Sequence, residues 1–168
     1  MIEDSPDLAT IHSVMPRRTR LVRRAAGAAD REQVVAANVD VFFIVTSANR
    51  DANPRRLERY LAAVFESGAQ PVVVINKVDL VEPEALCDEI MRLSARAPHV
   101  PIVGVSAETG EGLRELGALV APRQTFAMIG SSGVGKSSLV NRLLGIERQP
   151  VLPIDENDRG RHTTTHRE

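Results

Sequence analysis

The chain has 168 residues, and its 21 Lys and Arg against 22 Asp and Glu give a formal charge of −1 with the histidines neutral. This is the length of one ordinary domain, and 43% hydrophobic with 26% charged residues is typical of a globular protein with a substantial core, which excludes a disordered or fibrous chain. The apolar runs are far shorter than the ~20 residues that cross a bilayer. The single cysteine, Cys87, excludes an intrachain disulfide and a cysteine zinc knuckle and favours a reducing, cytoplasmic setting.

The first 24 residues contain one predicted strand, residues 10–15, and then a cluster of arginines. The near-neutral net charge argues against a generally basic nucleic-acid coat, but guanidinium groups bind phosphates through paired hydrogen bonds. The alternative is a solvated strand or linker in which arginine stems lie over apolar neighbours, and both interpretations stay open. The cluster comprises Arg17, Arg18, Arg20, Arg23 and Arg24.

From Val41 onward, short β-branched apolar runs alternate with longer amphipathic stretches, a pattern typical of βα units and a parallel sheet. The predicted strands are residues 41–46, 71–75, 101–105 and 125–129. The predicted helices are residues 55–66, 84–94, 111–119 and 136–144. The second strand is apolar throughout, as expected for a strand covered on both faces. The tail, residues 146–168, is polar and is expected to form an exposed loop.

The strongest motif is GSSGVGKS at residues 130–137, a full match to G-x-x-x-x-G-K-[ST] between a predicted strand and a predicted helix. Glycines let such a loop wind so that its backbone N–H groups point at an anion, and the following helix adds its positive end. Lys136 is expected to reach the β and γ phosphates of a nucleotide, and Ser137 to supply a magnesium ligand. The alternative is an ordinary glycine-rich turn.

A second motif indicates which nucleotide base the site binds. Asn76, Lys77, Val78 and Asp79 follow the predicted strand 71–75, where ligands collect in parallel α/β sheets. The Asp79 carboxylate can accept two hydrogen bonds from the ring N–H and exocyclic amine of guanine. Adenine would leave that carboxylate unpaired. Lys77 can lay its stem over the base, and Asn76 can tie the base to neighbouring loops. The alternative is a helix-capping Asx turn.

A third motif, Ser106-Ala107-Glu108, follows the predicted strand 101–105, and the Ala107 N–H is expected to donate to the guanine carbonyl. Three motifs at the carboxyl ends of different parallel strands together predict a guanine-nucleotide site. The predicted GTP-binding residues are Asn76, Lys77, Val78, Asp79, Ser106, Ala107, Gly130, Ser131, Ser132, Gly133, Val134, Gly135, Lys136, Ser137 and Ser138.

The order of these motifs is unusual, because the phosphate loop precedes the base-binding motifs in the common GTPase fold and follows them here. This order and four further stretches resemble the RsgA (YjeQ) family of ribosome small-subunit-dependent GTPases, from about residue 11 to residue 166. The stretches are residues 16–20 (PRRTR), 32–40 (EQVVAANVD), 56–60 (RLERY) and 160–165 (GRHTTT).

The resemblance implies a circularly permuted P-loop GTPase domain of the α/β class, with a parallel sheet and helices on both faces in three α/β/α layers. It also implies hydrolysis of GTP to GDP and phosphate in late maturation of the small ribosomal subunit, stimulated by that subunit. The implied partners are GTP or GDP with Mg²⁺, the small subunit and its rRNA. A monomer without membrane association is expected.

The resemblance further assigns roles in the segment GRHTTT. Thr164 would close onto magnesium in the triphosphate state, with Thr163 or Thr165 as the alternative register. His162 would position or activate water, whereas without the resemblance His162 and His166 would be interpreted as solvated loop histidines.

Residues of this segment and residues named earlier together form the implied catalytic, metal-binding and rRNA-binding sets. The set implied for catalysis is His162, Lys136 and Thr164; the metal ligands implied are Ser137 and Thr164; the rRNA contacts implied are Arg17, Arg18 and Arg20.

Three features of the family are missing from the sequence: most of an N-terminal oligonucleotide-binding (OB) barrel, the D-x-P-G segment that senses the γ phosphate, and a C-terminal zinc domain. Residues 1–24 are interpreted as a remnant of the OB domain and a basic linker, and residues 25–168 as the GTPase domain truncated after its first switch loop. Zinc is expected only in a full-length member. This chain is expected to bind GDP about as well as GTP and to hydrolyse GTP slowly or not at all.

Two other functions stay open at this point. One is a non-hydrolysing, guanine-nucleotide-gated module that binds rRNA or the ribosome through the arginine cluster. The other is an ATP-dependent P-loop kinase, against which Asp79 argues.

Overall fold

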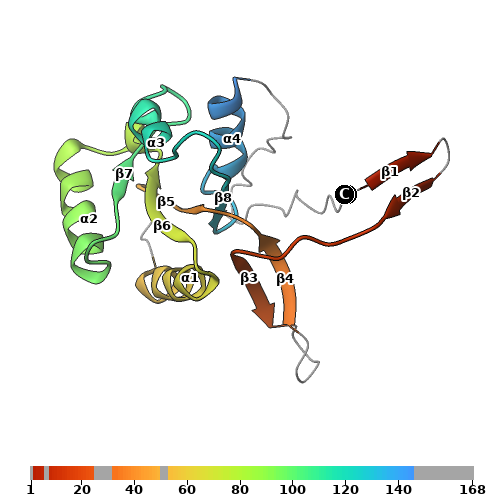
Figure 1. Ribbon diagram of the computed structural model, residues 1–168. Coiled ribbons are helices and arrows are strands. Elements are labelled where there is room, and N and C mark those ends of the chain that lie inside the picture. Colours follow the sequence, from red (N-terminus) through yellow and green to blue (C-terminus); the bar gives the residue numbers. More distant parts are fainter. Residues whose placement is uncertain (1, 6–7, 25–31, 50–52, 146–168) are drawn as a thin grey trace.

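The computed structural model describes residues 2–5, 8–24, 32–49 and 53–145 (Figure 1). Its centre is a four-stranded sheet in the order β7-β6-β5-β8, with every pair parallel. The four predicted strands are confirmed, with ends that differ by a single residue. They are β5 (Val41–Ser47), β6 (Gln70–Asn76), β7 (Ile102–Gly104) and β8 (Phe126–Gly130). Within the described residues, β7 and β8 form the two edges of this sheet.

Four helices follow these strands, as predicted. They are α1 (Pro54–Ser67), α2 (Pro83–Arg96), α3 (Leu113–Ala118) and α4 (Lys136–Leu144). Helix α1 begins where the Asn53 side chain accepts a hydrogen bond from the Arg56 N–H, with Pro54 in the first turn. It ends at Gly68, whose φ of 82° is left-handed. Helix α3 is shorter than predicted, since it begins only after Gly112.

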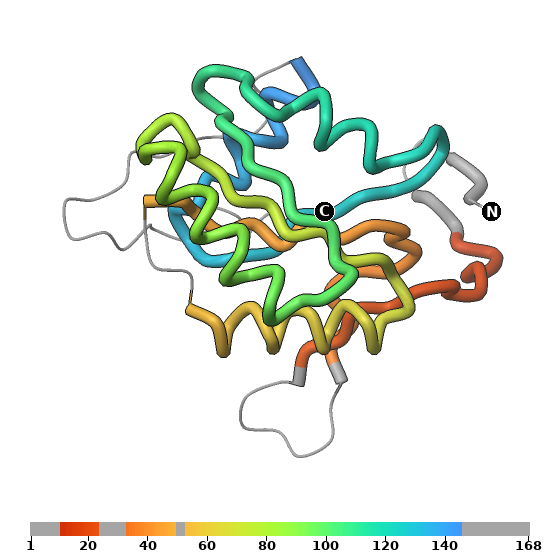
Figure 2. The backbone as a smooth tube through the Cα atoms, turned by 90° about the vertical axis from the view of Figure 1, so that its left-hand side faces the viewer, coloured from red at the N-terminus to blue at the C-terminus, as the bar shows by residue number. Residues whose placement is uncertain are grey.

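Each face of the parallel sheet buries its own apolar cluster, because successive side chains of a strand point to opposite faces. Phe42 of β5 shares one cluster with Leu61 of α1, and its neighbour Phe43 shares the other with Leu139 of α4. Helices α1 and α2 therefore cover one face, and α3 and α4 cover the other (Figure 2). This arrangement confirms the predicted three-layer α/β/α architecture.

An antiparallel hairpin precedes the sheet and was not predicted. It pairs β3 (Arg20–Arg24) with β4 (Glu32–Ala37) and has a bulge between Leu21 and Val22. Leu21 is buried in the cluster beneath α1, and the hairpin lies beside that helix (Figure 1). The predicted domain division between residues 24 and 25 falls between the two strands of this hairpin. The packing of the hairpin against α1 places β3 with the sheet domain.

A second antiparallel hairpin joins β1 (Ile2–Ser5) to β2 (Leu8–Ile11). The predicted strand at residues 10–15 is therefore wrong beyond Ile11. The register ends where Ile2 pairs with Ile11, and residues 12–15 have no strand partner in the described part of the chain. Their backbone cannot form a ladder without one. None of the described helices has the length and apolar character needed to span a membrane.

Candidate nucleotide-binding site

The predicted base and phosphate motifs meet at one edge of the sheet. Asn76 is the last residue of β6, Ser106 follows β7, and Gly130 is the last residue of β8. All three strands are parallel, so their carboxyl ends lie on the same side of the molecule. The chain moves from β5 to β6 on one side and later to β8 on the other, the arrangement that opens a ligand crevice in α/β sheets.

One buried side chain joins the three motifs. Asn76 is only 1% exposed, and its Nδ2 donates to the Val134 carbonyl oxygen at 2.9 Å. Its Oδ1 accepts from the Ala107 N–H at 3.2 Å. Both ends of a buried amide are thus satisfied, as buried polar groups require. The loops after β6 and β7 and the loop after β8 are therefore held in one arrangement by a single residue.

The other residues of the second motif differ in burial: Val78 lies in the core, whereas Lys77 and Asp79 reach the surface. Val78 is buried, and its N–H donates to the Val105 carbonyl oxygen at 3.2 Å, so its side chain supports the loop from below. Lys77 adopts a left-handed φ of 64° before the short 3-10 turn Val78–Leu80. The Asp79 carboxylate is exposed and has no hydrogen-bond partner among the described residues, so both its oxygens can accept from a ligand.

Two internal hydrogen bonds close the loop after β7. Ser106 is fully buried, its Oγ accepts from the Thr109 N–H at 3.0 Å, and its own N–H donates to the Glu111 carbonyl oxygen at 3.0 Å. The Ala107 N–H, predicted to meet the guanine carbonyl, donates to Asn76 Oδ1 here. A guanine carbonyl would therefore share this donor with Asn76.

Two glycines of the phosphate loop are required by close contacts. A Cβ on Gly130 would lie 2.3 Å from the Val45 carbonyl oxygen, and one on Gly135 would lie 2.3 Å from Asn76 Nδ2. Gly135 also has a φ of 93°, which side chains rarely adopt. The loop therefore packs against both β5 and the base-side motif, and its glycines permit these approaches.

Lys136 folds back over this loop. Its Nζ donates to the Gly130 carbonyl oxygen at 3.1 Å and to the Ser131 carbonyl oxygen at 2.7 Å. Burial lowers the pKa of Lys136, because desolvation disfavours the ammonium form. The hydroxyl of Ser137, in the first turn of α4, has no hydrogen-bond partner within the described ranges. An ammonium and a free hydroxyl thus stand at the start of α4, where an anion is favoured.

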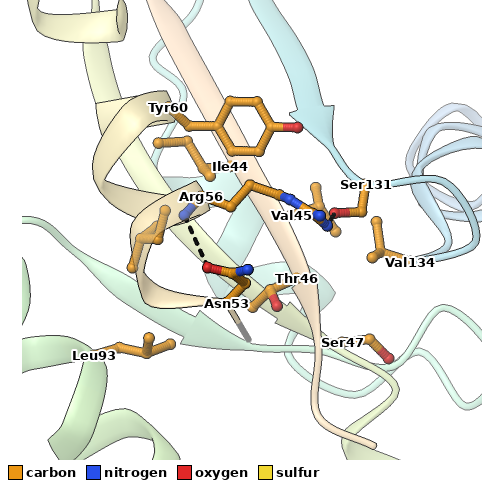
Figure 3. A pocket seen from close by; sticks show the side chains of 11 residues that line it. Ile44, Val45, Thr46, Ser47, Asn53, Arg56, Tyr60, Leu93, Ser131 and Val134 are labelled. Atoms are coloured by element: carbon orange, nitrogen blue, oxygen red, sulfur yellow. Dashed lines mark hydrogen bonds between the residues drawn. The ribbon is translucent and has the colours of Figure 1, made fainter. Parts of the chain in front are cut away.

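A contact missed from the sequence lies behind the loop. Arg56 of α1 donates from Nη1 to Ser131 Oγ at 2.6 Å. The two residues line a pocket of about 110 Å³ that also includes Thr46 and Tyr60 (Figure 3). This is smaller than the roughly 300 Å³ of ordinary ligand sites, and its lining includes neither Asp79 nor Lys136. The hydrogen bond from Arg56 supports the loop from this side. Arg56 and Ser131 are 75 residues apart, so no local sequence pattern indicates this contact.

No metal cluster of three or more His, Cys, Asp or Glu side chains occurs among the described residues. A magnesium ion at this site would depend on few protein ligands and on nucleotide phosphates, which is the usual mode for this ion. The residues predicted to act in the tail lie outside the described residues. They are His162, Thr163, Thr164, Thr165 and His166.

The predicted rRNA contacts Arg17, Arg18 and Arg20 are exposed. Arg18 Nη2 lies 3.6 Å from Asp40 Oδ1, and the Arg18 N–H donates to Asn38 Oδ1 at 2.8 Å. Arg18 therefore also fastens the chain before β3 to the turn before β5. Arg20 lies in β3, which agrees with the exposed-strand interpretation of the cluster without deciding whether it binds phosphates.

Comparisons with known proteins agree with this geometry. The model of the family RsgA GTPase matches residues 14–168. The small ribosomal subunit biogenesis GTPase RsgA of Opitutus terrae is 52% identical over 161 residues, which cover 94% of this chain and 43% of that protein. The chain thus spans less than half the length of this relative.

Two solved structures have the same fold. The crystal structure of YjeQ from Thermotoga maritima aligns with a TM-score of 0.63 at 29% identity, over 80% of this chain and 45% of that one. The structure of YloQ, described as a circularly permuted GTPase, aligns with a TM-score of 0.60 at 22% identity, over 84% of this chain and 46% of that one. With the order of its motifs, its parallel sheet and these matches, the chain belongs to the RsgA GTPase family.

Proposed function

We propose that this protein binds GTP and hydrolyses it to GDP and phosphate in the late maturation of the small ribosomal subunit, and that the subunit stimulates hydrolysis. The observation that carries the proposal is Asn76, which joins the base-side loops to the phosphate loop through Ala107 and Val134. The name of the relative from Opitutus terrae, a small ribosomal subunit biogenesis GTPase, supports the same role.

In this proposal the base is read on the β6 and β7 side. Asp79 accepts from the ring N–H and exocyclic amine of guanine, and Lys77 lies along the base. The Ala107 N–H, shared with Asn76, donates to the guanine carbonyl. Adenine is rejected because it offers Asp79 no matching pair of donors.

The phosphates lie in the loop of residues 130–137, beneath its backbone N–H groups and at the N-terminus of α4. Lys136 exchanges the carbonyl oxygens of Gly130 and Ser131 for phosphate oxygens, which hold an ammonium more strongly. Val78 and Val134 are buried and support the site through the core and through their backbone groups. Ser131 and Ser132 belong to the loop around the phosphates, and Ser138 belongs to the first turn of α4.

Magnesium is proposed to accompany the nucleotide and to neutralise charge on its phosphate oxygens. Ser137 fits as a ligand because its hydroxyl has no other partner in the described part of the chain. Thr164, or Thr163 or Thr165 in another register, would add a second hydroxyl. His162 would hold the attacking water, which completes the catalytic set of His162, Lys136 and Thr164.

The wider setting is also a proposal. The protein is expected to act in the cytoplasm as a monomer and to contact rRNA through Arg17, Arg18 and Arg20. The division into residues 1–24, a remnant OB domain and linker, and residues 25–168, a GTPase domain, stays a prediction. The packing of Leu21 under α1 favours counting β3 with the second part.

The experiment that tests the proposal is calorimetric titration of the chain with GDP and with ADP, each with magnesium, followed by phosphate release from GTP with small subunits present. Binding of GDP without ADP is the expected result, together with phosphate release that is slow in this chain and that the subunits raise. Equal binding of ADP would overturn the guanine site. GDP binding with subunit affinity that depends on the nucleotide, but no phosphate release, would favour the non-hydrolysing module.

A further inference from the structure

Arg142 reaches from the last turn of α4 to the loop that follows β7. Its Nη2 donates to the Glu108 carbonyl oxygen at 2.9 Å. Glu108 directly follows Ala107, whose N–H is the proposed donor to the guanine carbonyl. Helix α4 and the loop before α3 stand side by side at the same end of the sheet (Figure 1). The phosphate-binding helix thus contacts the base-reading loop directly.

The two partners of this hydrogen bond are exposed, but residues near each of them pack on the same apolar cluster. Leu139, one turn before Arg142, is fully buried there, and Leu116 of α3 is fully buried beside it. The Gly145 N–H closes the end of α4 onto the Arg142 carbonyl oxygen at 3.2 Å. Helices α4 and α3 thus pack on the same core, and the hydrogen bond from the Arg142 side chain links α4 to the loop before α3.

The loop has few other restraints from outside itself. Ser106 closes it internally, and Asn76 Oδ1 receives the Ala107 N–H. In the proposed complex a guanine carbonyl would share that N–H with Asn76. The bond from Arg142 to Glu108 does not involve this donor, so guanine binding would leave it intact.

We propose that Arg142 is a positioning residue for guanine recognition, which holds the Ala107 N–H at the guanine carbonyl by fastening the Glu108 carbonyl to α4. This inference rests on the proposed guanine site. It assigns Arg142 no contact with the nucleotide. Its effect is therefore confined to nucleotides that carry the carbonyl oxygen at position 6 of the purine.

The test compares GDP with 6-thioguanosine diphosphate, which keeps the phosphates, the ring N–H and the 2-amino group but carries a weakly accepting sulfur in place of the 6-carbonyl oxygen. Arg142→Ala is expected to weaken GDP about fivefold, the effect of one hydrogen bond, and to leave the analogue unchanged. Arg142→Lys, which can still donate to a carbonyl, is expected to recover most of the loss. Dissociation constants are measured by calorimetry on the full chain.

Arg114→Ala is the matched control, because Arg114 is an exposed arginine of α3 whose described contact is its neighbour Glu115. It should change neither dissociation constant. Equal weakening of GDP and the analogue by Arg142→Ala, or no weakening of either, would overturn the role of Arg142 alone. A parent chain that binds neither nucleotide would overturn the proposed guanine site and this inference together.

Discussion

Strands β6 and β8 both end in loops of the candidate site, but they are held in the molecule differently. β6 lies inside the sheet, paired on both sides, and every residue after Gln70 is buried. β8 is paired only with β5 among the described residues, and each of its residues is half-buried. The motif Asn76–Asp79 is therefore built on the core, whereas the phosphate loop, like the loop after the other edge strand β7, stands on an edge and depends on contacts from its neighbours.

The largest expected effect comes from a substitution that crowds the phosphate loop against Asn76. Gly135→Ala would place a methyl group on Asn76 Nδ2 and force a left-handed backbone on alanine. We expect GDP affinity to fall by about a hundredfold or more, because both the loop and the amide must move. Calorimetric titration with GDP measures this change.

Gly117→Ala is its control, since a Cβ at Gly117 of α3 meets no atom within 4 Å. GDP affinity should be retained in that variant. Retention of GDP affinity by Gly135→Ala as well would show that the contact with Asn76 does not constrain the loop.

The base side is tested by Asp79→Ala. We expect the preference for GDP over ADP to fall about a hundredfold, because a charged acceptor of two hydrogen bonds is lost. Competition of GDP and ADP for the same chain measures the preference. Asp88→Ala on the exposed side of α2 removes an equal charge and should leave the preference intact. If Asp88→Ala had the same effect as Asp79→Ala, general charge and not base recognition would be responsible.

The edge side is tested by Arg56→Ala, which removes the hydrogen bond to Ser131 Oγ. We expect GDP and GTP to be weakened alike, each about fivefold, because the contact supports the loop and does not read the number of phosphates. Arg55→Ala, at the adjacent exposed residue of α1, is the matched control and should bind both normally. A loss confined to GTP would instead place Arg56 beside the third phosphate.

The smallest effect concerns pH. Burial holds the pKa of Lys136 below its ordinary value in the free protein, whereas phosphates favour the ammonium. GDP affinity should therefore fall as the pH rises from neutral through this lowered pKa, with proton uptake on binding in that window. The same pKa shift penalises the charged folded state at low pH, and the penalty is relieved as the pH rises through the folded pKa.

Lys136→Arg separates this effect from ionisation of the guanine ring, which affects both variants alike. Arginine keeps its charge, so the part of the fall that belongs to Lys136 should be absent. Titrations at several pH values up to about 10 measure it. Identical pH profiles for the two variants would contradict the assignment.

The interior strand and its motif could be predicted because their signals are local. A continuous apolar run predicts β6, and Asn76 to Asp79 follow it directly in the sequence. The β3–β4 hairpin was missed because Leu21 and Val22 are adjacent and arginines flank them, so β3 lacks the alternation of apolar and polar residues that marks a strand, and a bulge between the two shifts the register.

The same distinction holds within the site. The motifs predict which backbone and side-chain groups face the nucleotide, but Val78 turned out to lie in the core. The contacts of Arg56 with Ser131 and of Arg142 with Glu108 span 75 and 34 residues. Long side chains that cross between elements are placed by packing, and so they become visible only in the structure.

The close approach of Gly135 to Asn76 has a genetic consequence. The space that a methyl group at position 135 would need is filled by the amide at position 76. A selection for suppressors of Gly135→Ala should therefore recover small residues at position 76. Such a pair would relieve the contact with the methyl group but would also remove the hydrogen bonds of Asn76 to Val134 and Ala107. The suppressed protein should therefore regain only part of its phosphate binding, and its discrimination between purines should be weaker.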